Sequence, residues 1–328
     1  MDSTTTIEIS SLMNWHLRRR VTAAVLIFCA IALSGCATTP YSFGSAARYY
    51  SSPELAARTE VQMERGRPHK AIDTFGWVWG IPSKILLWDR RVENHRIDAH
   101  TESQLATYLR ENELSTVKVR LNQYHPRDDW HRLVANKSVG AGWRYTVGVV
   151  SVAVEAIIPG RLFGGDHYNP YTDTIHLYSG SPAIALHEAG HAKDFARRKW
   201  KGTYAAARIL PIVPLIQEAI ATSDTLGYLE ATQSVSAQQE AYEILYPAYG
   251  TYVGAEIKTL GPFGVILGAI GGHAVGQWKS WQLEEEREEE ERQYRESQIR
   301  QSQNSFTSPG SEMPSRSAMS EKKPAVAQ

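Results

Sequence analysis

Two histidines and a glutamate with the spacing HExxH stand at residues 187–191, within the stretch ALHEAGHAKDFARRKWKG (185–202). On a helix, His187 and His191 lie one turn apart on one face, so both imidazoles can bind the same ion, and Asp194 follows on that face. Glu188 points slightly aside, towards the open coordination position, where a general base acts on water. We therefore expect one Zn²⁺ ion on His187 and His191, with Glu188 as the catalytic residue and Asp194 as a candidate supporting residue.

The flanking residues predict that this stretch is a buried helix. Ser181 can cap its N-terminus, Pro182 suits the first helical position, and Gly202 can end it after a run of cations. Gly190 lets another backbone come close. The alternatives are a histidine pair on the surface or a pair hydrogen-bonded elsewhere in the core. The small and apolar neighbours favour burial, and burying two histidines and a glutamate without a shared partner would be costly.

A catalytic zinc ion needs a third protein ligand, and Glu218 is the preferred candidate. In PLIQEAIATSDTLGYLEATQ (214–233), Leu215 begins an apolar helical stripe and Glu218 projects at the edge of that stripe. A carboxylate at this edge can face a buried ion, or it can be a solvated neighbour of the core. Thr222, one turn further on, is a candidate for a supporting hydrogen bond. The other carboxylates that could complete the site are Glu230, Glu240 and Glu243.

These residues together resemble a known family. The HEAGH motif, followed by QEAIATSDTLGYL and EAYEILYPAYGTYVG, is similar to gluzincin-type zinc metallopeptidases, most closely the membrane-associated neutral zinc metallopeptidases. Glu218, Ala221 and Thr222 match the second element of that family, and residues 251–253 match its TYV segment. The resemblance covers about residues 170–255 and implies a zinc-dependent endopeptidase with Glu218 as a ligand. Lys193 is less apolar than the family's extended motif.

Peptide hydrolysis is the chemistry that such a site implies. Glu188 takes a proton from water and passes it to the leaving amine, while another group stabilises the oxyanion. The segment YTDTIHLYSG (171–180) is expected to be an edge strand that holds the substrate backbone. The sequence leaves six candidates for the oxyanion donor: His167, Tyr168, Tyr171, His176, Tyr249 and Tyr252.

The pattern along the chain predicts an α+β fold, a mainly helical zincin-like domain with a small β-sheet edge. Residues 102–114 have helical spacing, whereas residues 115–124 alternate like a strand, and a second β-like run occupies 173–180. The 35 basic and 35 acidic residues give a formal net charge of zero, so no electrostatic bias favours nucleic acid as a partner. The expected partners are a peptide or protein substrate and a membrane.

The N-terminus resembles a bacterial lipoprotein signal. Three arginines at 18–20 precede the apolar run VTAAVLIFCAIALSGC, which ends in Leu33-Ser34-Gly35-Cys36. The resemblance implies cleavage after Gly35 and a diacylglyceryl group on Cys36, with Ala37 favouring the outer membrane and the body in the periplasm. An ordinary secretory peptide or a transmembrane helix is the alternative, and translation can begin at Met1 or Met13. Cys29 would leave with the signal, so the metal ligands must be His, Asp or Glu.

The predicted organisation is sequential. Residues 1–35 are the signal, 36–60 a tether, 61–258 the metallopeptidase-like domain, 259–280 a Gly-rich apolar segment, 281–303 a charged helix and 304–328 a disordered tail. In TLGPFGVILGAIGGHAVGQW (259–278), glycines recur every four residues from Gly264. This spacing is typical of a helix that enters the membrane or pairs with a second copy, and equally of a tightly packed helical hairpin.

Two functional classes fit the sequence. The first is a lipid-anchored periplasmic zinc metallopeptidase. The second is a non-catalytic envelope scaffold or adaptor lipoprotein that keeps a structural metal and acts through its Gly-rich segment. The intact Glu188 argues against the second class, because a structural zinc ion has no need of a general base.

Overall fold

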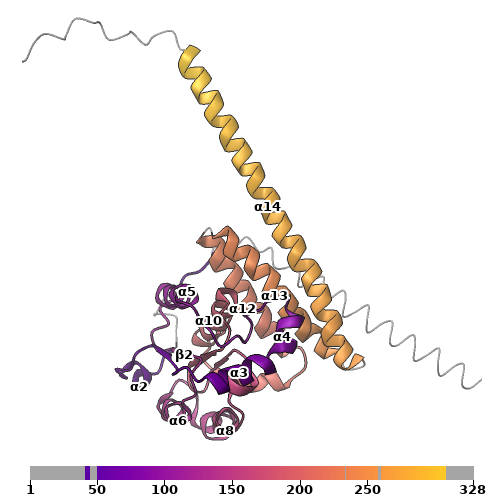
Figure 1. Cartoon of the computed structure of the whole chain (residues 1–328). Coiled ribbons are helices and arrows are strands. Elements are labelled where there is room, and N and C mark those ends of the chain that lie inside the picture. Colours follow the sequence, from indigo (N-terminus) through magenta and orange to yellow (C-terminus); the bar gives the residue numbers. More distant parts are fainter. Residues whose placement is uncertain (1–40, 45–49, 233, 258–259, 308–328) are drawn as a thin grey trace, which may run out of the picture. The chain divides into compact units, whose positions relative to one another are not determined.

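The computed structural model describes residues 41–44, 50–232, 234–257 and 260–307 (Figure 1). Cys36 and the expected signal lie outside the described residues, as do residues 308–328 of the predicted tail. The chain divides into two units, residues 1–281 and 282–328. The first is mainly helical with one small sheet, which agrees with the expected α+β class.

A four-stranded sheet with the order β1-β2-β4-β3 lies at the centre of the first unit. β1 (Met63–Arg65), β2 (Lys118–Leu121) and β4 (Thr174–Leu177) are parallel, and β3 (His167–Asn169) pairs antiparallel with β4. β2 and β4 confirm the two β-like runs in the sequence. The expectation that residues 171–180 form an edge strand is wrong, because the short turn before β4 folds β3 back onto its outer side.

Helices cover both faces of this sheet. The long helices are α5 (Ala99–Glu111), α10 (Pro182–Ala196), α12 (Val213–Ala231), α13 (Val235–Glu256) and α14 (Pro262–Thr307). The shorter elements are α2 (Pro53–Ala56), α3 (Lys70–Trp79), α4 (Ile81–Leu86), α6 (Pro126–Ala135), α7 (Ala141–Trp143), the π-helix η2 (Arg144–Gly148), α8 (Val149–Ile157), α9 (Gly160–Phe163), α11 (Lys201–Ala206) and the 3₁₀ helix η3 (Ala207–Ile209).

The two faces of the sheet are chemically different. One face is apolar: Val119 and Ile175 pack with Leu105 of α5 and Ala189 of α10 in the main core. The other face is polar although it is buried. Arg120 there pairs with Asp128 and Asp129 of α6, at 2.6 and 2.8 Å. In Figure 1, α6 and α8 lie on the side of β2 away from α5 and α10.

The predicted tether is wrong for the residues that the structure describes. Tyr41 packs against the main core and its hydroxyl bonds Asn112 at 2.9 Å. Leu55 of α2 is buried, and Ser52 donates to the carbonyl of Ala135. The segment was predicted to be a tether because most of its residues are small and polar. Its few apolar side chains are nevertheless buried in the core by the hydrophobic effect, and composition does not reveal this.

The glycines of the Gly-rich segment pack α14 against α13. A Cβ atom at Gly268 would overlap the backbone carbonyl of Gly250, and one at Gly264 would overlap that of Gly254. Gly272 and Gly276 face α13 backbone in the same way. Of the two interpretations, the structure shows the tightly packed helical hairpin, in which glycine permits close approach of two backbones.

α14 continues beyond the hairpin into the second unit. Its residues 282–303 are almost all exposed and carry i,i+3 and i,i+4 ion pairs such as Arg295–Glu291 at 3.6 Å. The predicted charged helix is therefore present, as a continuation of the Gly-rich segment. Among the described residues, no helix has both the length and the apolar content needed to cross a bilayer.

We expect Gly268→Ala to destabilise the first unit by about 1–3 kcal/mol, because the new methyl group would be forced into the α13 backbone. Gly271, on the same helix, is the matched control, since nothing lies within 4 Å of its Cβ position. Gly271→Ala should be neutral or stabilising by up to about 1 kcal/mol. Urea unfolding of both variants measures the difference, and equal stabilities would contradict the hairpin.

Candidate metal centre

α10 places the two motif histidines on the apolar side of the sheet. Pro182 lies in its first turn, as expected, and Ser181 occupies its N-cap position. The Ser181 side chain makes no capping hydrogen bond and donates to Glu240 instead, so the expected cap is not formed. The helix ends at Ala196, so the prediction that Gly202 ends it is wrong. Gly202 lies instead in α11, where a Cβ atom would overlap Trp143. The shorter helix still contains His187 and His191 a full turn apart and buries almost every residue between Pro182 and Phe195.

α12 carries Glu218 and crosses α10 at Gly190. A Cβ atom on Gly190 would lie 2.9 Å from the carbonyl oxygen of Ala221, so only glycine fits at this crossing without a shift. Glu218 stands one turn before Ala221 on the same side of α12. The close approach that Gly190 predicts from the sequence is therefore present, and it brings the Glu218 carboxylate to the histidines.

His187, His191 and Glu218 form a compact cluster of possible metal ligands. Glu218 Oε2 lies 3.0 Å from His187 Nε2 and 3.3 Å from His191 Nε2, and the three ligand atoms lie within 4.8 Å of one another. Two ligand atoms at tetrahedral positions about 2.0–2.1 Å from one ion are about 3.3 Å apart. The cluster could therefore hold a metal ion, and its two imidazoles and one carboxylate suit zinc.

The charges in this cluster stabilise one another. Burial alone would raise the pKa of Glu218, but the charges of His191 and His187 and the hydrogen bonds from them hold it well below its ordinary value. Burial likewise opposes protonation of His191, yet Glu218 raises its pKa. The other oxygen of Glu218 accepts a 2.8 Å hydrogen bond from Arg208 at the end of η3. An ionised carboxylate is the form that binds a cation.

The two predicted supporting residues differ in their positions. Thr222 Oγ1 lies 3.5 Å from Nδ1 of His187, at the outer limit of a hydrogen bond, and so adjoins a histidine instead of the expected Glu218. Asp194 does not support the ligands in this structure. Its carboxylate accepts hydrogen bonds from Arg198 and, at 2.6 Å, from Tyr204, because α11 returns the chain to that side of α10.

Glu188 faces a cavity beside the cluster. The cavity has a volume of about 250 Å³, and its walls include His187, Glu188 and Glu218, with residues of α4 and α13 opposite. Glu188 is 7% exposed, and it forms no hydrogen bond or ion pair with any residue that the structure describes. Burial raises the pKa of its carboxyl group, and the charges of Glu218 and Asp166 add to this, while the two histidines act in the opposite direction.

The structure separates the six candidates for an oxyanion donor. Tyr249 and Tyr252 of α13 line this cavity. Tyr168 donates to Asp173 at 2.7 Å, and Tyr171 belongs to a separate apolar cluster with Leu133. His167 and His176 are stacked on each other on the polar face of the sheet.

The alternative third ligands lie outside the cluster. Glu240 pairs with Arg91 at 2.9 Å and accepts a hydrogen bond from Ser181. Glu243 accepts a 3.4 Å hydrogen bond from Ser280 of α14. Glu230 is exposed near the end of α12. Of the four carboxylates named from the sequence, the structure brings Glu218 alone to the two histidines.

Three polar residues at the site had no signal in the sequence. Arg208 contacts Glu218, while Glu93 and Asp166 line the cavity wall. Glu93 comes from the loop between α4 and α5, and Asp166 from the residues just before β3, far from the motif in the chain. Only the tertiary fold brings them near α10.

Comparisons with protein-family models, with curated proteins and with solved structures give no match for this chain. The geometry of the site is therefore what indicates the function of this chain.

We expect His187→Ala, His191→Ala and Glu218→Gln each to reduce the affinity for zinc at least about 10-fold, because each removes a ligand from a three-residue cluster. Glu240→Gln is the matched control and should leave the affinity unchanged. Competition with a chromophoric chelator measures zinc affinity on the purified protein. If Glu218→Gln bound zinc as tightly as the wild type, Glu218 would not be a ligand.

Proposed function

We propose that this chain is a zinc-dependent metallopeptidase of the gluzincin type, in which His187, His191 and Glu218 hold the ion and Glu188 is the general base. We also propose that the protein is anchored through a lipid on Cys36 and faces the periplasm. The basis for the anchor is the lipobox at residues 33–36, and the basis for the chemistry is the site.

The state of Glu188 is the observation that carries this proposal. A largely buried carboxylate that has no hydrogen-bond partner in the protein can keep its charge only where water or an ion reaches it, and a structural metal site does not need such a group. Glu188 has no such partner among the described residues, and it borders an open cavity next to the metal cluster. This arrangement suits a base that must act on a water molecule from outside the protein.

The fold around the site is consistent with a zincin-like domain. A helix with both histidines packs on a mostly parallel sheet, the outer strand β3 is antiparallel, and a second helix supplies the glutamate. In this proposal the free side of β3 replaces β4 as the place where an extended substrate backbone would pair.

The residues of the chain have distinct roles in the reaction. A bound zinc ion would supply Lewis acidity, which polarises the scissile carbonyl and acidifies water. Glu188 accepts a proton from the attacking water as its oxygen adds to the carbonyl carbon, and then delivers that proton to the amide nitrogen as the C–N bond breaks. Arg208 orients Glu218 through its 2.8 Å contact.

Tyr252 is the best placed oxyanion donor. It lines the cavity together with Glu188 and Glu218, and 39% of the residue is exposed. Burial of its hydroxyl and the charges of Glu218 and Glu188 raise its pKa, so the hydroxyl keeps its proton at neutral pH. Tyr249 lines the same cavity. Burial and Glu218 raise its pKa to about 12, and its hydroxyl is fully enclosed.

Glu188→Gln should retain zinc and lower kcat for peptide hydrolysis by about 10²–10⁴-fold, because the amide cannot accept the water's proton. Zinc content and kcat are measured on the same preparation, with a quenched-fluorescence peptide library as substrate. A zinc-loaded Glu188→Gln protein that cleaves as fast as the wild type would refute the assigned mechanism.

Tyr252→Phe should lower kcat by about 10²–10³-fold with little change in KM, since an oxyanion donor acts mainly in the transition state. Tyr249→Phe is the control from the same helix and cavity, and its kcat should stay near that of the wild type. The opposite order of the two variants would assign the role to Tyr249.

A further inference from the structure

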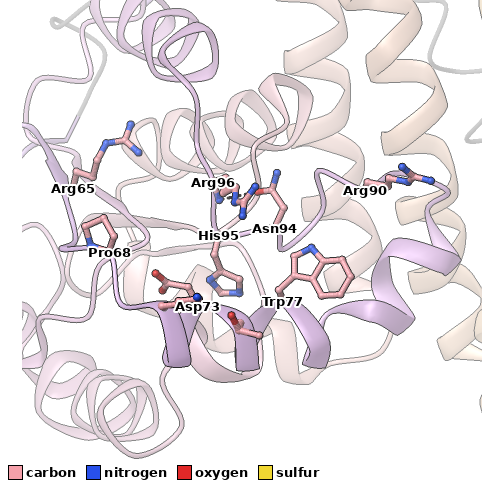
Figure 2. Close-up of a pocket in the computed structure, with 10 residues that line it drawn as sticks. Arg65, Pro68, Asp73, Trp77, Arg90, Asn94, His95 and Arg96 are labelled. Atoms are coloured by element: carbon pink, nitrogen blue, oxygen red, sulfur yellow. Dashed lines mark hydrogen bonds between the residues drawn. The ribbon is translucent and has the colours of Figure 1, made fainter.

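A second cavity, of about 770 Å³, opens beside α3 and has a basic lining (Figure 2). Arg65 and Arg90 stand at its two ends, Arg96 lies on the wall opposite α3, and Trp77 points into it from the helix. Lys70, in the first turn of α3, completes the set of cations. The cavity is separate from the metal cluster, and no residue lines both.

The positive charge of this cavity is not neutralised by the protein. Among the residues that the structure describes, Lys70, Arg90 and Arg96 form no ion pair, whereas Arg65 pairs with Glu102. Asp73 is the one carboxylate in the lining, and it is already held by other groups. Its oxygens accept hydrogen bonds from Arg161, from the side chain of Asn122 and from a backbone amide. The cavity therefore favours an anionic ligand.

The helix that lines the cavity also exposes apolar side chains to solvent. Phe75, Val78 and Trp79, each about half exposed, continue the exposed face of α3 from Trp77 at the cavity edge round to the far side of the helix, where the rings of Phe75 and Trp79 meet Phe163 of α9. α8 also exposes Val150, Val154 and Ile157. Soluble proteins rarely leave so many large apolar side chains together in water without a function.

We propose that this cavity binds the phosphate of an anionic phospholipid headgroup, while Phe75, Trp79 and Phe163 lie in the interfacial layer of the bilayer. Lysine and arginine beside exposed tryptophan and phenylalanine are the residue types that bind an anionic membrane surface. A soluble phosphate would need the cations but not the exposed tryptophan at the cavity edge or the aromatic residues that continue the exposed face of α3. This membrane contact is independent of the peptidase chemistry and of acylation at Cys36.

The test uses the full chain purified in a neutral detergent, titrated calorimetrically with three ligands: short-chain phosphatidylglycerol, short-chain phosphatidylcholine and inorganic phosphate. Phosphatidylglycerol should bind most tightly. The double variant Arg90→Gln/Arg96→Gln should weaken that binding roughly 25-fold, since each basic residue near an anionic membrane surface contributes about fivefold. Arg127→Gln removes an exposed arginine of α6 outside the cavity and should have no effect.

The aromatic surface has its own arm in the experiment. Phe75→Ser/Trp79→Ser should weaken phosphatidylglycerol binding and leave phosphate binding unchanged, whereas Trp200→Ser, at an exposed tryptophan elsewhere, should change neither. The charge-preserving pair Arg90→Lys/Arg96→Lys should retain binding, which separates loss of charge from loss of fold. Equal binding of phosphatidylglycerol by the wild type and Arg90→Gln/Arg96→Gln would overturn the proposal. So would phosphate binding as tight as lipid binding, with no effect of the aromatic substitutions.

Discussion

The close contact between α10 and α12 is the constraint on which the site depends. At Gly190 the two backbones approach so closely that a methyl group would touch the carbonyl of Ala221. With a larger residue, the helices would separate, and Glu218 would move away from both histidines, which it now meets at 3.0 and 3.3 Å. A metal ion tolerates ligand displacements of only a few tenths of an ångström, so this packing contact determines whether the three residues can act together.

A buried ion pair holds the same two helices together on the far side of Gly190. Lys193 of α10 is almost completely buried and pairs with Asp224 of α12 at 2.7 Å, and Tyr41 and Tyr108 enclose the pair. Burial lowers the pKa of Lys193 to about 8, although Asp224 opposes the shift. Losing one partner of such a pair typically costs about 3–5 kcal/mol. The buried charge of Lys193 on α10 is thus compensated by Asp224 on the helix that carries Glu218.

The sequence predicted the parts of the site that local periodicity determines. The face shared by His187 and His191, the N-terminus of α10 and the close approach at Gly190 follow from spacing within one helix, and Glu218 followed from the edge of a second stripe. Arg208 and the Lys193–Asp224 pair were missed because they depend on contacts between separate elements. The hydrophobic pattern also did not predict β3. This strand has only three residues, and it forms because a turn folds it onto β4. Asp194 was assigned to the metal site because helical periodicity predicts the side of the helix on which its side chain lies. Periodicity does not predict which residues of other elements meet it there, and in the structure α11 supplies them.

The loop between α4 and α5 shows how strain at one position is balanced by contacts at another. Trp88, Glu93 and His95 all have positive φ, a conformation that costs a non-glycine residue roughly 1–2 kcal/mol. Hydrogen bonds to the segment just before α10 offset this cost. The amide of His95 donates to the carbonyl of Tyr178 at 2.8 Å, and the amide of Glu93 donates to the Ser179 hydroxyl at 2.7 Å. Because the same loop lines the metal cavity at Glu93 and the basic cavity at Arg90 and Arg96, these bonds fix one wall of each cavity to the start of the metal-binding helix.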